Sequence, residues 1–193
     1  MYKRQVLPYT IGDYLSDEIR TGEISTDAPE FITAEEEVRV RLAKFIYNKG
    51  KNSVDYYHKK LGKIMWNQCG MSRNEKELKQ AIDDIKSLRK DFYENVKVPG
   101  KSDEFNEELA KAGRVADFLE LGELFAKDAL ERTESCGGHF REESQTPEGE
   151  ALRDDEYFNF VSAWKYNGEP SDAELIKEKL YYQEIEVKTR SYK

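Results

Sequence analysis

The stretch from residue 103 to residue 132 constrains the fold of this chain most, because its second half is apolar around the whole circumference of a helix. Its first half carries a single apolar stripe formed by Phe105, Leu109 and Ala112. From Val115 to Leu130, apolar side chains point in almost every direction. A helix that is apolar on all sides needs neighbours on all sides. We therefore expect a long helix that the rest of the chain, or a partner, must cover.

Three amphipathic helices are predicted before this stretch. The first begins at Thr33, which forms a capping box with Glu36, and ends at Gly50. The second follows Ser53 and ends near 69–70, and the third follows Asn74 and ends at 99–100. Short connections between successive helices predict an antiparallel up-down bundle. The expected buried positions are Val38, Leu42, Phe45 and Ile46 in the first helix, Val54, Tyr57, Leu61, Ile64 and Met65 in the second, and Leu78, Ile82, Ile85, Leu88 and Phe92 in the third.

The two ends of the chain differ from this helical middle. A short helix is expected over 10–20 and a loop over 22–31. After a turn at 146–149, aromatic residues alternate over 157–166, which predicts a strand, and Asn167-Gly168 marks a turn. We expect the segment 180–188 to pair back on this strand. The sequence thus predicts a mainly α fold, an antiparallel three- or four-helix bundle of spectrin-repeat-like style with a small C-terminal β hairpin or tail.

These patterns divide the chain into three parts. We interpret residues 1–32 as a linker, with residues 1–5 as a non-native opening. Residues 33–145 form the helical bundle domain, and residues 146–193 form a β or extended tail.

Charge and composition exclude several classes of function. The net charge is −8, and the densest basic segments, 49–51 and 59–60, are small, which argues against nucleic acid as a partner. No apolar run approaches the ~18 residues that span a bilayer. The opening residues lack the apolar centre of a secretory signal. Two cysteines make no disulfide framework, so we expect a reducing, cytoplasmic setting.

The loop of residues 131–143 directly follows the apolar helix and is the richest in chemical groups. It holds two arginines, four carboxylates, one thiol, one imidazole and the pair Gly137-Gly138. Adjacent glycines at a helix end bend the backbone and allow close approach of a ligand or another backbone. The pattern indicates either a site of chemistry or a docking corner.

The groups of this loop suit two kinds of chemistry. The thiol of Cys136 near His139, with Glu134 orienting the imidazole, would form a nucleophilic site. A zinc site would also need His58 and Cys69, which the helix rise places about 16 Å apart. No glycine-rich phosphate loop follows a strand. The residues therefore indicate no self-contained active site.

Several motifs together resemble the C-terminal region of succinate dehydrogenase and fumarate reductase flavoprotein subunits, most closely the menaquinone-linked anaerobe type. The resemblance extends roughly over residues 6–193. The stretches that carry it are Glu134-Ser135-x-Gly137-x-His139-Phe140-Arg141 with Arg153-Asp154-Asp155, His58 to Trp66 with Gly70 to Arg73, Arg114 to Leu124, and Arg190-Ser191-Tyr192.

The resemblance implies that the chain is the helical C-terminal domain of a larger enzyme that interconverts succinate and fumarate. FAD and the catalytic residues would belong to the preceding flavin-binding and capping domains, so no catalytic, cofactor or metal residue is assigned here. An iron–sulfur subunit and a membrane cytochrome b subunit would carry electrons to or from quinone. The implied location is cytoplasmic, peripheral at the inner face of the cell membrane. This chain alone is expected to be inactive.

In this interpretation the loop is a docking corner, and the apolar helix lies between the bundle and the flavin domain. The expected docking residues are Glu134, Ser135, Gly137, His139 and Arg141. Cys136 and Gly138 depart from the family, in which Arg and Ala are common at these positions. The alternatives are a stand-alone helical protein-interaction module, a thiol enzyme using Cys136, and the C-terminal domain of a related flavoprotein such as L-aspartate oxidase.

Overall fold

The computed structural model describes residues 11–12, 25–101 and 104–188. The chain divides into two compact units, residues 1–41 and 42–193. Apart from residues 11–12, the short helix expected over 10–20 lies outside the described residues, as does the motif 190–192.

Helix α2 (Pro29–Ile46) begins earlier than expected and runs across the boundary between the units. Proline suits a first helical position because its fixed φ matches the helix and it has no N–H to leave unbonded. The hydroxyl of Thr33, which was expected to cap the helix, instead donates to the Pro29 carbonyl at 2.9 Å from inside the first turns. Val38 is 45% exposed, so its expected burial was wrong, and the buried stripe begins only at Leu42.

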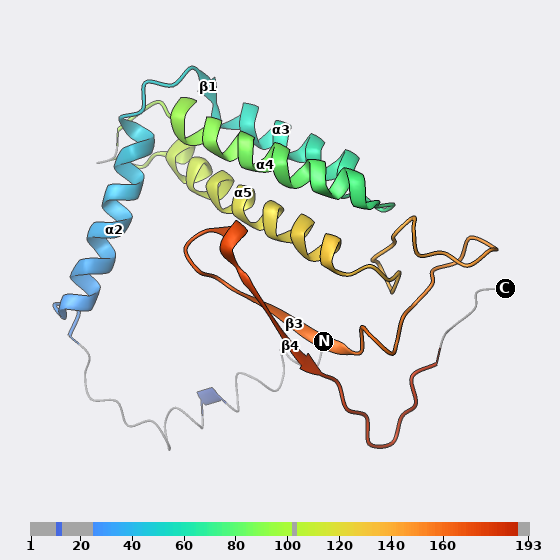
Figure 1. Cartoon of the computed structure of the whole chain (residues 1–193). Helices are drawn as coiled ribbons and strands as arrows, with labels where there is room; N and C mark the ends of the chain where they lie inside the picture. The colour runs from blue at the N-terminus through green and yellow to red at the C-terminus, as the bar shows by residue number, and fades with distance from the viewer. Residues whose placement is uncertain (1–10, 13–24, 102–103, 189–193) are drawn as a thin grey trace. The chain divides into compact units, whose positions relative to one another are not determined.

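The bundle itself consists of α3 (Val54–Gln68), α4 (Glu75–Asn95) and α5 (Glu107–Glu131), and α4 runs antiparallel to both α3 and α5 (Figure 1). The side chain of Ser53 accepts a hydrogen bond from the N–H of Tyr56, and that of Asn74 accepts one from Glu77. The expected caps of α3 and α4 are thereby confirmed. Asn106 caps α5, so Phe105 lies ahead of the helix and is 90% exposed, against the expected stripe.

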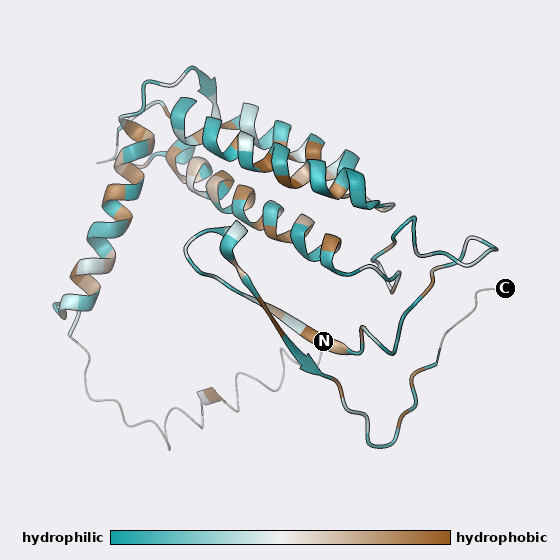
Figure 2. Ribbon diagram, in the orientation of Figure 1, coloured by the Kyte–Doolittle hydropathy of each residue, from teal (hydrophilic) through white to brown (hydrophobic). Residues whose placement is uncertain are grey.

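The core of the bundle lies between the three helices, and the end of α2 adds Phe45, whose ring meets that of Phe92 with centroids 5.5 Å apart. Figure 2 shows apolar and polar residues alternating along the helices, as amphipathic packing requires. Of the expected positions, five are only partly buried: Leu42, Ile46, Ile64, Met65 and Ile82. The fully enclosed side chains include Tyr57, Phe45, Phe92, Leu78, Ile85 and Leu119.

A short parallel contact joins the start of α3 to the end of α4. Strand β1 (Asn52–Ser53) pairs with β2 (Val96–Lys97). Just before it, a Cβ on Gly50 would lie 2.1 Å from the Asn95 carbonyl oxygen, so the chain passes there only because residue 50 is glycine.

The tail forms the expected hairpin, but with a different second strand. Strand β3 (Phe160–Lys165) pairs antiparallel with β4 (Glu174–Lys179), not with 180–188. The linker between them holds a short 3-10 helix, η1 (Pro170–Asp172), which reverses the chain early and lets the return strand begin at Glu174. The turn at 146–149 is confirmed by the hydrogen bond from Gly149 to the Thr146 carbonyl. Among the described residues, no helix is both long and apolar enough to cross a membrane.

Candidate functional site

The corner, residues 131–143, is built around Arg141, which lies under the C-terminal end of α5. Its side chain is 3% exposed. Nη1 donates to the Ala129 carbonyl at 2.9 Å and to the Leu130 carbonyl at 3.2 Å, and Nε donates to a Glu143 carboxylate oxygen at 3.1 Å. The last carbonyls of a helix lack partners within the helix and attract cations. Arg141 therefore closes the end of α5.

Ser135 fixes the backbone on which Arg141 stands. Its fully buried hydroxyl accepts a hydrogen bond from the Arg141 N–H at 2.8 Å and donates to the Arg141 carbonyl at 3.2 Å. The Ser135 N–H donates to the Leu152 carbonyl at 2.9 Å, which ties the corner to the tail.

Glu134 is a second buried charged side chain, 4% exposed. One oxygen pairs with Arg132 at 2.6 Å, and the other accepts a hydrogen bond from the Asp154 N–H at 2.8 Å. Both oxygens are thus engaged, and neither contacts the imidazole of His139. The expectation that Glu134 would orient this imidazole was wrong, because Arg132 and the backbone N–H of Asp154 occupy its two oxygens.

The two nitrogens of the His139 ring are also engaged. Arg73 donates to Nδ1 at 2.8 Å, and Nε2–H donates to the Arg132 carbonyl at 2.7 Å. A guanidinium donor on Nδ1 requires the neutral imidazole. Burial lowers the pKa of His139, and nearby arginines lower it further, while the bond to the Arg132 carbonyl opposes them. His139 contacts Cys136 through two backbone hydrogen bonds at 2.8 and 3.0 Å, so the chain holds the imidazole as a structural link.

Arg73 belongs to the corner although the sequence analysis did not assign it to the site. It donates to the carbonyls of Cys69 and Gly70 at the end of α3, and its guanidinium lies 5.0 Å from the centre of the Phe125 ring. The Arg73 N–H donates to the Phe140 carbonyl, and the Arg73 carbonyl accepts a hydrogen bond from the Glu142 N–H. The available signal was its place three residues after the predicted helix end at Gly70, within reach of the last unpaired carbonyls of the helix.

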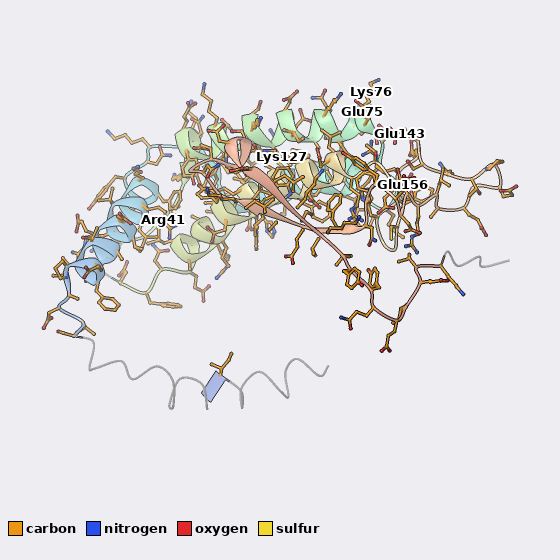
Figure 3. The ribbon with its side chains drawn as sticks, turned by 60° about the horizontal axis from the view of Figure 1, so that its bottom comes forward. Arg41, Glu75, Lys76, Lys127, Glu143 and Glu156 are labelled. Atoms are coloured by element: carbon orange, nitrogen blue, oxygen red, sulfur yellow. The ribbon has the colours of Figure 1, made fainter. Side chains whose placement is uncertain are left out.

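The acidic end of the corner caps α4. A Glu143 oxygen accepts a hydrogen bond from the Glu75 N–H at 2.6 Å, and Ser72 donates to Glu142 at 2.7 Å (Figure 3 labels Glu75 and Glu143). Carboxylates are stabilising at a helix N-terminus. Burial raises the pKa of Glu143, but these hydrogen bonds and Arg141 outweigh it and leave the pKa lowered. The corner therefore joins the ends of α3 and α5 to the start of α4.

Two hollows adjoin these elements. One, of about 620 Å³, lies between the corner and the tail and is lined by six carboxylates and two arginines, with ion pairs Arg141–Glu143 and Arg153–Asp155. Within the described ranges, no three His, Cys, Asp or Glu side chains gather to hold a metal ion.

The second hollow is an apolar groove of about 310 Å³ between α3 and α5. Phe118 is 41% exposed, Leu121 60% and Phe125 48%. These three side chains belong to the apolar stretch of α5, and α3 and α4 do not cover them. The groove is lined by His58, Leu61, Gly62, Met65, Phe118, Leu121, Gly122 and Phe125.

Known proteins are similar to this chain in sequence and fold. The family model described as the fumarate reductase flavoprotein C-terminal region matches residues 58–192. An uncharacterised FAD-dependent oxidoreductase of Methanocaldococcus jannaschii is 34% identical over 112 residues, which is 58% of this chain and 20% of that protein. The fumarate reductase flavoprotein subunit of Helicobacter pylori is 28% identical over 131 residues, covering 68% and 18%. The chain thus spans about a fifth of the length of these relatives.

Solved structures repeat the arrangement within longer chains. A quinol-fumarate reductase with menaquinol molecules superimposes with a TM-score of 0.72 at 22% identity, over 91% of this chain and 29% of that one. The Sdh1 complex of Mycobacterium smegmatis superimposes with a TM-score of 0.63 at 26% identity, over 91% of this chain and 27% of that one. An adenosine-5-phosphosulfate reductase gives 0.68 at 16%, over 96% and 29%, so the fold alone does not fix a substrate. The family match extends over most of the chain, and this protein therefore belongs to the fumarate reductase flavoprotein C-terminal family.

Proposed function

We propose that this chain is the C-terminal helical domain of the flavoprotein subunit of a succinate dehydrogenase or fumarate reductase, and that it scaffolds the flavin-binding part. The observation that carries the proposal is the family match over residues 58–192. The parent subunit would bind FAD in its flavin-binding and capping domains and interconvert succinate and fumarate. The names of the relatives, an FAD-dependent oxidoreductase and a fumarate reductase flavoprotein subunit, support this assignment.

The apolar groove is the surface proposed to meet the flavin-binding part. Leu121, Phe118 and Phe125 are each about half exposed, although they lie on the same helix as fully enclosed residues such as Leu119. Fully burying a Leu or Phe side chain is worth ~1.5–3 kcal/mol, so covering the exposed halves favours association by about 1 kcal/mol each. Proteins of which this fold forms under a third, such as the quinol-fumarate reductase, have additional chain to provide such a cover.

The corner is proposed to dock through its backbone turn. The side chains of Glu134, Ser135, His139 and Arg141 are bonded within the chain and hold the shape of the corner. At its tip, Gly137 has φ +59°, and a Cβ added there would meet nothing within 4 Å. The exposed glycine turn therefore leaves room for the backbone of the flavin-binding part to approach closely.

The proposed assembly contains two further subunits. An iron–sulfur subunit would take electrons from the flavin, and a membrane cytochrome b subunit would pass them to or from quinone at the inner face of the cytoplasmic membrane. The menaquinol named with the solved quinol-fumarate reductase supports a quinone as the electron partner.

The reading frame upstream of Met1 tests the proposal. It should continue into a flavin-binding region, and the purified full product should show flavin absorbance and reduce fumarate or oxidise succinate. The 193-residue chain alone should do neither. A stop codon in frame directly before Met1, or turnover by the chain alone, would refute the proposal.

A further inference from the structure

One buried carboxylate lies where α4, α5 and the linker of the hairpin meet. Glu123 of α5 is 0% exposed. Its oxygens lie 3.9 Å from Lys86 Nζ and 3.4 Å from Arg89 Nη2, both on α4. Among the described residues, no donor makes a hydrogen bond to either oxygen. A buried carboxylate without donors is costly in its charged form.

The same arginine also holds the hairpin. Arg89 Nη2 lies 2.8 Å from a carboxylate oxygen of Glu169, at the start of the η1 linker. Arg89 thus stands between a buried carboxylate and a carboxylate that is 60% exposed. The charged groups around Glu123 are therefore Lys86 and Arg89 from α4, Lys127 from α5, and Glu169 from the linker.

The linker is bound to α5 one turn beyond Glu123. Lys127 donates to the carbonyls of Ser171 and Ala173, each at 3.0 Å, and lies 4.6 Å from the centre of the Trp164 ring (Figure 3 labels Lys127). The Trp164 indole N–H donates to Asp128 at 2.8 Å. These polar contacts fasten a hairpin whose strands are mostly exposed. The linker closes over α5 beside the buried carboxylate.

We propose that Glu123 couples the docking of the β3–β4 hairpin to pH, so that the hairpin is held more tightly as the pH falls. When the hairpin is docked, the carboxylate is buried and faces Glu169. When it undocks, water reaches the carboxylate. Burial raises the pKa of Glu123 in the docked state, and Glu169 adds to this, whereas Arg89, Lys86 and Lys127 oppose it.

The sign follows from linkage. A carboxyl whose pKa is higher in the docked state takes up a proton on docking. The contribution of Glu123 to docking is therefore complete below the ordinary glutamate pKa of about 4.3 and is lost as the pH rises through the raised pKa of Glu123. This inference needs only the contacts of the chain itself and does not depend on the proposed parent enzyme.

Trp164 fluorescence in the full 193-residue chain tests the proposal, with Trp66→Phe removing the other indole, which is 83% exposed. We expect the emission to change with pH, with a midpoint above the ordinary glutamate pKa of about 4.3. Glu123→Gln, a neutral isostere, should remove this transition. The control Glu120→Gln, one turn earlier on α5, should keep it.

Hydrogen exchange of the β3 amides, corrected for intrinsic rates, gives a second measurement without any substitution. Protection should be greater at about pH 5 than at about pH 7 in the wild-type chain. Persistence of the fluorescence transition in Glu123→Gln would overturn the proposal. Equal or lower β3 protection at the more acidic pH would overturn it as well.

Discussion

The corner and the apolar groove both adjoin α5, but they differ in how their side chains are satisfied. In the corner, Glu134, Ser135 and Arg141 are buried, and their polar atoms bond within the chain. In the groove, Leu121 and Phe125 expose about half of their surface. The region with the most functional groups thus supports the fold, whereas the groove, lined by apolar side chains and His58, leaves apolar surface exposed.

Arg141→Ala should have the largest effect, because it removes the cation from under the end of α5 and takes the donor from one Glu143 oxygen and from the carbonyls of Ala129 and Leu130. We expect the free energy of unfolding to fall by about 3 kcal/mol. Denaturant unfolding of the chain measures this. Arg141→Lys, which keeps the charge but not the several donors of the guanidinium, should lower the free energy of unfolding less. A loss under about 0.5 kcal/mol would show that the corner is not a structural clamp.

Leu121→Ser should do the opposite. Leu121 is 60% exposed, so the stability of the chain should change by less than about 0.5 kcal/mol. Its affinity for the flavin-binding part should fall about tenfold, since the apolar contact in the groove is lost. Titration calorimetry of the two parts measures the affinity.

Leu119→Ala is the matched control for Leu121→Ser, two residues away on α5 and 0% exposed. It should lower the free energy of unfolding by ~2–5 kcal/mol, because it leaves a cavity in the core. If both variants destabilised the chain alike, the groove would be part of the core rather than an open surface.

His139 should make the corner sensitive to acid. Its pKa is lowered in the folded chain, mainly by burial, so the unfolded chain binds protons more readily. The stability that His139 contributes is complete above the unfolded pKa of about 6.5 and is lost as the pH falls through the lower folded pKa. Unfolding measured from about pH 8 to pH 5 should show this slope, and His139→Gln should flatten it. A slope unchanged in His139→Gln would contradict the neutral link to Arg73.

Cys136→Ser should have the smallest effect. Cys136 contacts His139 through backbone bonds, which serine keeps. We expect a stability change within about 0.5 kcal/mol and no loss of succinate or fumarate turnover in the parent enzyme. Loss of an ester- or thioester-cleaving activity in this variant would instead favour the thiol enzyme.

Local signals in the sequence predicted the caps of α3 and α4 and most of the core. Ser53 and Asn74 were identified as caps because a capping side chain bonds an N–H only three residues further along the chain. Long-range contacts were missed. Arg73 reaches His139 from 66 residues away, and no periodicity encodes that distance. The return strand was misplaced because its start depends on the η1 turn, and Phe105 was misassigned because Asn106 caps the helix.

Co-purification of this chain with a separately expressed flavin-binding region from its upstream reading frame tests the central claim most directly. The account predicts that the wild-type chain elutes together with the flavin absorbance, that Leu121→Asp abolishes this co-elution, and that Leu121→Asp alone still unfolds cooperatively like wild type. Co-elution that persists undiminished in Leu121→Asp would contradict the groove as the docking surface. The absence of any co-elution with the wild-type chain would contradict the scaffold role itself.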